Sequence, residues 1–170
     1  MPLPAELSKQ GVPFGTILAF AGDVNAIPKG WLLCDGAPVD RINLPKLFDA
    51  IGTAWGGSGA NMFFLPDLRG MFLRGVSLRT GVDPDAEERI SPKIGEANPG
   101  NQKDNVGSIQ PDSFRHHSHK YVSHAAFGAE GHGGDAQLRE SIRDTEETGG
   151  SETRPVNAYV HYIIKAFDTV

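Results

Sequence analysis

The chain has 170 residues, enough for one domain with a hydrophobic core or for two very small domains. Its 21 glycines and 12 prolines predict many turns and short elements, because both residues interrupt helices and strands. A net charge of -5 without a basic stripe argues against a nucleic-acid-binding protein. The single cysteine excludes an intrachain disulfide, and no apolar run of about 18 residues predicts membrane insertion.

The first half of the chain predicts two short strands and one helix. Residues 1–13 suit a lead-in or linker, residues 16–21 a buried strand between glycines, and residues 31–34 a second strand. Pro45 suits the first position of a helix, and Gly52 suits its C-terminal cap. Between them, apolar residues recur with helical spacing and predict a single buried face.

The second half is more polar and less periodic. Residues 81–170 carry 9 basic and 15 acidic side chains, and residues 80–112 would be disordered if left without partners. A helical turn is expected around Leu138 to Ile142, and residues 157–166 predict a terminal strand rich in aromatic and β-branched residues. Since this half has little apolar surface of its own to bury, we expect partner chains to complete it.

His117 and His119 are the candidate metal ligands. On an extended strand, residues i and i+2 point to the same face, so their two imidazoles would lie side by side. Two donors are fewer than the four to six or so that a metal site usually needs. The remaining donors would come from His124 and His132, or from other copies of the chain. A pair of ordinary surface histidines is the third possibility.

Four separate blocks of the sequence resemble the phage tail collar domain. They stand at residues 14–17 (Phe-Gly-Thr-Ile), 28–36 (Pro-Lys-Gly-Trp-Leu-Leu-Cys-Asp-Gly), 44–48 (Leu-Pro-x-Leu-Phe) and 65–75 (Leu-Pro-Asp-Leu-Arg-Gly-x-Phe-Leu-Arg-Gly). Residues 107–119, with the His-x-His pair, and residues 152–165 resemble later parts of tail fibres that carry this domain. The order and spacing of the blocks are more specific than any one of them.

The resemblance implies a fold that is mainly β, with much irregular structure and one short helix, assembled as an intertwined homotrimer. Residues 14–80 would be the collar domain, and residues 81–170 an intertwined fibre-tip region. Three His-x-His pairs would then hold one transition-metal ion per trimer on the threefold axis, with iron or zinc as the expected metal. The chain would be made in the bacterial cytoplasm without a signal peptide and act in a virion tail or extracellular particle.

The function that the resemblance implies is adhesion rather than catalysis. The chain would form the tip of a phage tail fibre, or of the fibre of a contractile injection particle. It would bind a glycan or outer-membrane component of the bacterial surface and contact other tail proteins. The polar, glycine-rich segment 121–150 suits a recognition loop, with Tyr121, Phe127 and His132 as candidate receptor contacts. A collar or baseplate component without a receptor and a metal-dependent glycan hydrolase are the alternatives.

Several other side chains have both a functional and a structural interpretation. Cys34 follows an apolar run, which favours a buried thiol over a nucleophile. Asp67, Arg69 and Arg74 are expected to hold irregular backbone together by charge-assisted hydrogen bonds, although they could form a catalytic cluster. Trp31 and Trp55 are expected to pack in the core rather than to stack on a sugar.

Overall fold

The computed structural model describes residues 11–113, 121–125, 139–143 and 155–169. The chain divides into two compact units, the first formed by residues 1–110 and 158–170 and the second by residues 111–157. The described parts are mainly β with one short α-helix, which confirms the fold class predicted from the sequence. No helix among the described residues is long and apolar enough to cross a membrane.

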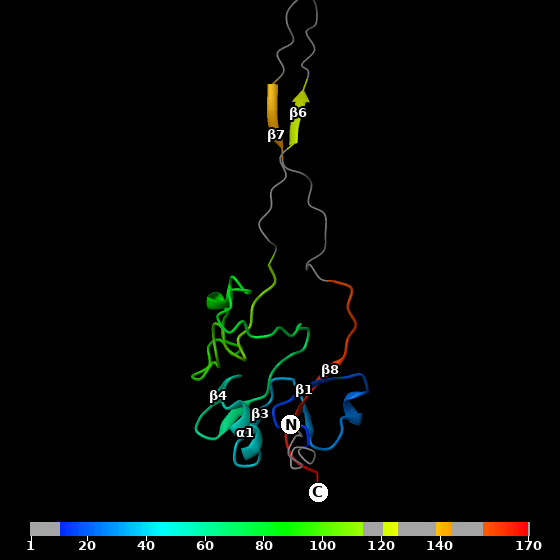
Figure 1. Ribbon diagram of the computed structural model, residues 1–170, viewed down its shortest axis with the longest axis vertical. Coiled ribbons are helices and arrows are strands. Elements are labelled where there is room, and N and C mark those ends of the chain that lie inside the picture. Colours follow the sequence, from blue (N-terminus) through cyan, green and yellow to red (C-terminus); the bar gives the residue numbers. More distant parts are fainter. Residues whose placement is uncertain (1–10, 114–120, 126–138, 144–154, 170) are drawn as a thin grey trace, which may run out of the picture. The chain divides into compact units, whose positions relative to one another are not determined.

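The first sheet of unit 1 joins the two ends of the chain. Its strands are β1 (Ile17–Phe20), β8 (His161–Lys165) and β2 (Trp31–Leu33), and β8 pairs antiparallel with both of the others. Ile164 of β8 lies opposite Ile17 and Leu32, so it is covered on both sides and is fully buried. Figure 1 shows β8 beside β1. All three strands confirm the predicted apolar segments.

The second sheet of unit 1 is smaller and was not predicted. Its strands are β3 (Pro38–Asp40), β5 (Met62–Phe64) and β4 (Gly57–Ser58), with β5 in the centre. Phe63 is fully buried, and its ring meets that of Phe48 edge-on at a centroid distance of 5.3 Å. These strands have two or three residues each, too few for the alternation of apolar and polar residues that marks a strand to show in the sequence.

The helix α1 (Pro45–Ile51) closes the core beside this sheet. Pro45 occupies the first turn, and Gly52 ends the helix with φ +53° and donates its N–H to the Phe48 carbonyl. Leu47 is fully buried in the core, where it belongs to one cluster with Cys34, Phe63, Leu65, Leu68, Ile164 and Ala166. The predicted helix is therefore confirmed with its start and its end.

Two short 3-10 helices lie in the loops of unit 1. They are η2 (Val24–Ala26), which is capped by the Asp23 carboxylate, and η3 (Ala86–Glu88). Residues 80–110 are otherwise loops, but their backbone is hydrogen-bonded to residues 54–57, which follow α1. Gly57 donates its N–H to the Asn98 carbonyl and Asn101 donates to the Ala54 carbonyl, both at 2.9 Å. This segment finds partners within its own chain, which the sequence did not predict.

The two strands described in unit 2 form an antiparallel hairpin. It consists of β6 (Tyr121–Ala125) and β7 (Arg139–Arg143), which run side by side in Figure 1. Val122 pairs with Ile142, and Ser123 pairs with Ser141. The helical turn expected around Leu138 to Ile142 is therefore wrong. The backbone of residues 139–143 pairs with that of residues 121–125 and is therefore extended.

Candidate functional site

The predicted metal ligands fall outside the part of the chain that the structure describes. His117 and His119 are not among the described residues, and neither are Phe127 and His132. Tyr121 is the first residue of β6, where only the backbone is described. Within the described ranges, no group of three or more His, Cys, Asp or Glu side chains is arranged to hold a metal ion. The metal site and the receptor contacts therefore stay predictions.

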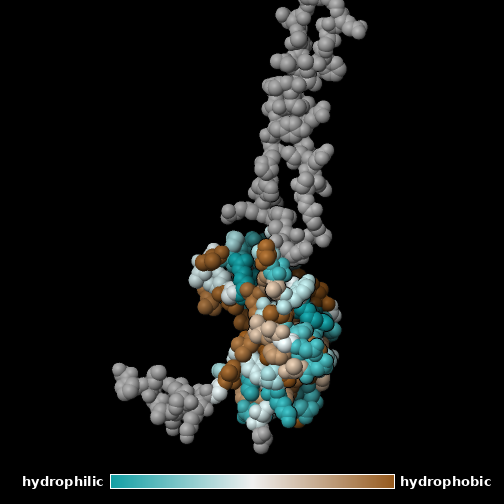
Figure 2. All heavy atoms as spheres, turned by 90° about the vertical axis from the view of Figure 1, so that its right-hand side faces the viewer, coloured by the Kyte–Doolittle hydropathy of each residue, from teal (hydrophilic) through white to brown (hydrophobic). Residues whose placement is uncertain are grey.

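The most conspicuous surface feature of unit 1 is a run of exposed apolar side chains. This apolar segment, residues 71–82, contains Met71, Phe72, Leu73, Val76, Leu78 and Val82, all of which are exposed. Phe72 is 62% exposed, Leu78 78% and Val82 79%. Figure 2 shows brown, hydrophobic residues open on the surface among teal, hydrophilic ones. Apolar side chains gathered in this way mark an interaction surface more often than an ordinary solvated face.

The turn in the middle of the apolar segment is held by one carboxylate. Asp104 accepts the backbone N–H of Ser77 at 2.8 Å and that of Arg79 at 2.7 Å. Leu78 and Arg79 have φ angles of +50° and +61°, which L-amino acids seldom adopt. A conformation of this kind persists only where surrounding contacts enforce it. Asp104 therefore fixes a loop that displays Leu78 to the outside.

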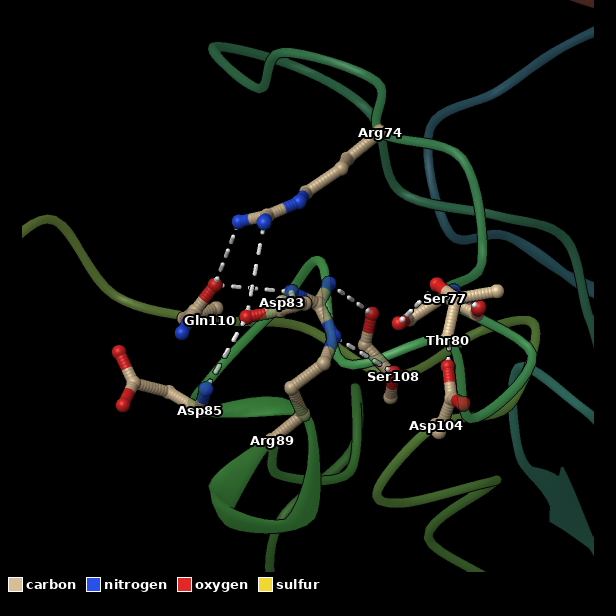
Figure 3. A network of polar contacts seen from close by, with 9 residues as sticks. All are labelled: Arg74, Ser77, Thr80, Asp83, Asp85, Arg89, Asp104, Ser108 and Gln110. Atoms are coloured by element: carbon tan, nitrogen blue, oxygen red, sulfur yellow. Dashed lines mark hydrogen bonds and ion pairs between the residues drawn. The ribbon is translucent and has the colours of Figure 1, made fainter.

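The far end of the apolar segment is anchored by a second carboxylate, Asp83. It is 8% exposed and lies between two guanidinium groups, 3.5 Å from Arg74 and 3.6 Å from Arg89. The backbone N–H of Asp85 also donates to it, at 3.2 Å. Figure 3 shows both arginines pointing toward Asp83 from different loops. A buried carboxylate is tolerated because two cations and a hydrogen bond compensate its charge.

Arg89 extends this network to Gln110, the last residue of the first segment of unit 1. Its guanidinium donates to the Ser108 hydroxyl at 2.9 Å, to the Ser108 carbonyl at 3.0 Å and to the Gln110 side chain at 2.9 Å. Ile90 and Ile109 exchange two backbone hydrogen bonds of 2.9 Å next to it. Polar contacts thus replace the apolar core that these loops lack. The network is a positioning device, since it fixes the loops from which the apolar side chains project.

A second exposed apolar stretch precedes β8. Val156 is fully exposed, Tyr159 is 95% exposed and Val160 is also exposed. A tyrosine ring with almost all of its surface in water buries none of the apolar area that makes aromatic residues stabilising. The stretch continues directly into β8, the central strand of the first sheet. It is a second surface that lacks cover within the described residues.

The side chains with an alternative catalytic interpretation have structural roles. Cys34 is 2% exposed in the core, and its burial, with a smaller effect from Asp35 and Asp67, raises the pKa of the thiol to about 12. Asp67 accepts two hydrogen bonds from the Arg69 guanidinium, at 2.8 Å and 2.6 Å, and the bond to Arg69 lowers the pKa of the carboxyl. Arg74 reaches Asp83 instead. All three side chains thus make charge-assisted contacts, but these ion pairs join side chains rather than backbone groups.

The two tryptophans differ in their surroundings. Trp55 is half-buried and packs against the core cluster, as predicted. Trp31 is half-buried in β2, with the Lys165 ammonium 6.0 Å from its ring centre, and it lines an open cavity of about 620 Å3 with Phe14 and Lys46. Its ring does not belong to the core cluster, so core packing is the observed role of Trp55 alone.

A family model for the phage tail collar domain matches residues 15–73 of the chain. Residues 15–73 of the chain are a phage tail collar domain. The match covers β1 through β5 and α1 and ends at Leu73, inside the apolar segment. It confirms the resemblance carried by the four sequence blocks, and it points to a structural protein rather than an enzyme.

Two relatives extend the likeness beyond the collar domain. The chain is 35% identical to Protein RhiB of Rhizobium leguminosarum bv. viciae, with 81% of this chain and 64% of that protein covered. It is 30% identical to Short tail fiber protein gp12 of Enterobacteria phage T4, with 91% of this chain and 35% of that protein covered. The chain thus spans less than two thirds of the length of either relative.

Proposed function

We propose that this chain forms the homotrimeric tip of a phage tail fibre, or of a related fibre, and attaches the particle to a bacterial surface receptor. The observation that carries the proposal is the uncovered apolar segment, residues 71–82, at the end of a collar domain. The likeness to a short tail fibre protein supports a place in the virion tail, in contact with other tail proteins.

The exposed side chains explain why the chain would not work alone. Phe72, Leu78 and Val82 expose apolar surface whose burial contributes roughly 25 cal/mol per Å2. Other copies of the chain present the same surface, and a closed threefold arrangement buries it in every copy at once. The exposed residues Tyr159 and Val160, next to β8, provide further surface for the same contact.

The donor chemistry of the histidine pair fits a metal shared by three chains. His117 and His119 of each copy supply two imidazoles, so three copies supply six nitrogen donors, a set suited to an octahedral ion. Iron satisfies this set, and zinc would use fewer of the donors. When bound, the ion would link the three chains at residues that have little apolar surface to bury. His117 and His119 would be the residues that hold it.

Receptor attachment would use three equivalent copies of the segment 121–150. Its described residues form the β6–β7 hairpin, which can carry a recognition loop at its end. Tyr121, Phe127 and His132 remain the candidate contacts on this segment. Because three loops meet the surface together, weak single contacts add up to useful avidity.

Replacing two side chains of the apolar segment by serine tests whether this segment holds the trimer together. The double variant Phe72→Ser with Leu73→Ser should shift the chain from trimer to monomer in analytical ultracentrifugation. Ile42 provides the control, because it is 69% exposed on the loop before α1 and belongs to neither apolar stretch. Ile42→Ser should leave the trimer intact. A monomeric wild type, or equal loss of assembly in both variants, contradicts the proposal.

Replacement of residues 126–138 by a short glycine-serine linker tests adhesion. The trimer should persist while binding to bacterial cells is lost. If binding persists, the receptor contacts lie elsewhere. If the wild-type trimer does not bind cells of any host, the chain is a collar or baseplate component instead.

A further inference from the structure

A cavity of about 300 Å3 lies in unit 1, between residues 55–71 of the collar domain and the later loops at residues 92–109. This volume is at the lower end of the range for small-molecule sites. Its apolar lining consists of Trp55 after α1, Leu65 and Met71 after β5, and Pro92 and Ile109 from the later loops. The residues meet from positions more than fifty apart in the sequence, so only the folded chain forms the cavity.

Backbone hydrogen bonds fix the walls of this cavity. Lys93 donates its N–H to the Pro99 carbonyl at 3.0 Å, which closes the loop that carries Pro92. Ile109 is held by its two hydrogen bonds with Ile90, and the neighbouring Gly57–Asn98 bond ties the same loops to β4. A cavity with a fixed backbone loses little conformational entropy when a ligand enters.

Three charged side chains also line the cavity, and this charged edge has a net positive charge. Asp67 is held in its ionised form by Arg69, with Nε and Nη2 at 2.8 Å and 2.6 Å from its oxygens. Lys93 places its ammonium 3.4 Å from the Gly36 carbonyl and 4.9 Å from the Phe64 ring centre. An ammonium has three donors and a guanidinium five, so both cations keep free N–H groups.

We propose that this cavity binds one sugar residue that carries a carboxylate, as part of a bacterial surface glycan. The apolar wall at Trp55 would pack against the C–H face of the sugar ring. Asp67 would accept hydrogen bonds from ring hydroxyls, while Lys93 and Arg69 would bind the carboxylate. The inference rests on the adhesion role proposed above and places a receptor contact in the collar domain, outside residues 121–150.

The charge distribution is the reason for an acidic sugar. The whole chain carries -5, and this edge, with two cations and one carboxylate, is locally positive. A neutral sugar would leave the extra positive charge uncompensated, whereas a carboxylate gains a charge-assisted hydrogen bond in a half-buried site. Binding should weaken as salt is raised, because the edge is open enough for ions to screen it.

Titration of the full-length, 15N-labelled chain with three probes tests the inference by NMR. Glucuronate carries both the ring and the charge, glucose lacks the charge, and acetate lacks the ring. We expect glucuronate to bind at least roughly ten-fold more tightly than either control probe. The chain has two indole N–H signals, from Trp31 and Trp55, and only that of Trp55 should shift.

Two lysine variants provide the matched comparison. Lys93→Met keeps the aliphatic stem and removes the charge, and it should weaken glucuronate binding roughly ten-fold. Lys46→Met makes the same change in the open cavity beside Trp31, where Lys46 pairs with Asp168 on the surface, and should leave binding unchanged. Equal affinity for glucuronate and acetate, no binding, or a loss in Lys46→Met alone overturns the inference.

The outcome separates this inference from the proposed function. If glucuronate does not bind while the wild-type trimer still attaches to cells, the cavity is not a receptor site and the adhesion role stands. If the wild type does not attach to cells, the proposed function fails, whatever the NMR titration shows.

Discussion

Gly107 lies so close to the main-chain carbonyl of Ala54 that a Cβ atom at position 107 would overlap the carbonyl oxygen. Gly107 also has a φ angle of +96°, a conformation that L-amino acids rarely adopt. The same carbonyl accepts the N–H of Asn101 at 2.9 Å. Ala54, at the end of the turn after α1, is thus the point where the later loops of unit 1 dock on the collar domain.

This close approach predicts a large effect of one methyl group. Gly107→Ala should lower the free energy of unfolding by about 2–3 kcal/mol, through backbone strain and overlap together. Gly81→Ala is the control, because Gly81 has a φ of +77° but no atom within 4 Å of its Cβ position. It should cost about 1 kcal/mol, from strain alone. Equal losses in urea unfolding of the two variants would show that the docking at Ala54 is absent.

Removal of the buried charge at Asp83 should destabilise the loops of unit 1. Asp83→Asn leaves the half-buried Arg89 guanidinium without its carboxylate, and we expect a loss of about 2 kcal/mol in thermal unfolding. Glu87→Gln serves as the control, since Glu87 pairs with Lys103 at 3.2 Å on the open surface. It should change stability little, because exposed pairs are screened by water. The prediction fails if both variants melt at the wild-type temperature.

The pair of Asp67 and Arg69 predicts a dependence on pH. Hydrogen bonding to Arg69 holds the pKa of the Asp67 carboxyl below its ordinary value of 3.8. The ionised form therefore stabilises the fold above about pH 4, and this contribution is lost as pH falls through the folded pKa. The melting temperature of Asp67→Asn should lie slightly below that of the wild type at pH 7, and the difference should vanish at low pH. A difference that does not shrink as the pH falls below 3.8 contradicts this assignment.

The thiol of Cys34 should be unreactive in the folded chain. Burial raises its pKa to about 12, so the reactive thiolate is scarce at neutral pH, and reagents cannot reach the sulfur. Labelling with a thiol reagent at pH 8 should be slow in buffer and fast in urea, and its rate should follow the unfolded fraction. Labelling in buffer at the rate of a free cysteine would place Cys34 outside the core.

Local signals in the sequence were enough to predict α1 and the three strands of the first sheet, although not their pairing. Pro45, Gly52 and the spacing of Leu47 and Phe48 define a helix without reference to the rest of the chain. The apolar runs in β1, β2 and β8 are similarly self-contained. The alternation of inward and outward side chains that marks a strand cannot be recognised in β4 and β5, because these strands have only two or three residues. A helical turn was expected around Leu138 to Ile142, where the structure has β7.

The polar network could not be predicted, because its partners are far apart in the sequence. Asp104 holds the backbone of Ser77 from 27 residues away, and nothing near either residue indicates the other. The order of residues 80–110 depends on such pairs, which is why composition alone suggested disorder. Residues 71–75 of the apolar segment were part of the family resemblance, but the exposure of the segment became visible only in the folded chain. His117 and His119 stay a prediction from spacing and resemblance.

Native mass spectrometry of the purified chain, with and without a chelator, tests the central claim most directly, because it reports the number of chains and of metal ions together. The account predicts a trimer with one transition-metal ion, and weaker association after the metal is removed. A monomer, or one metal ion bound to each separate chain, would contradict it.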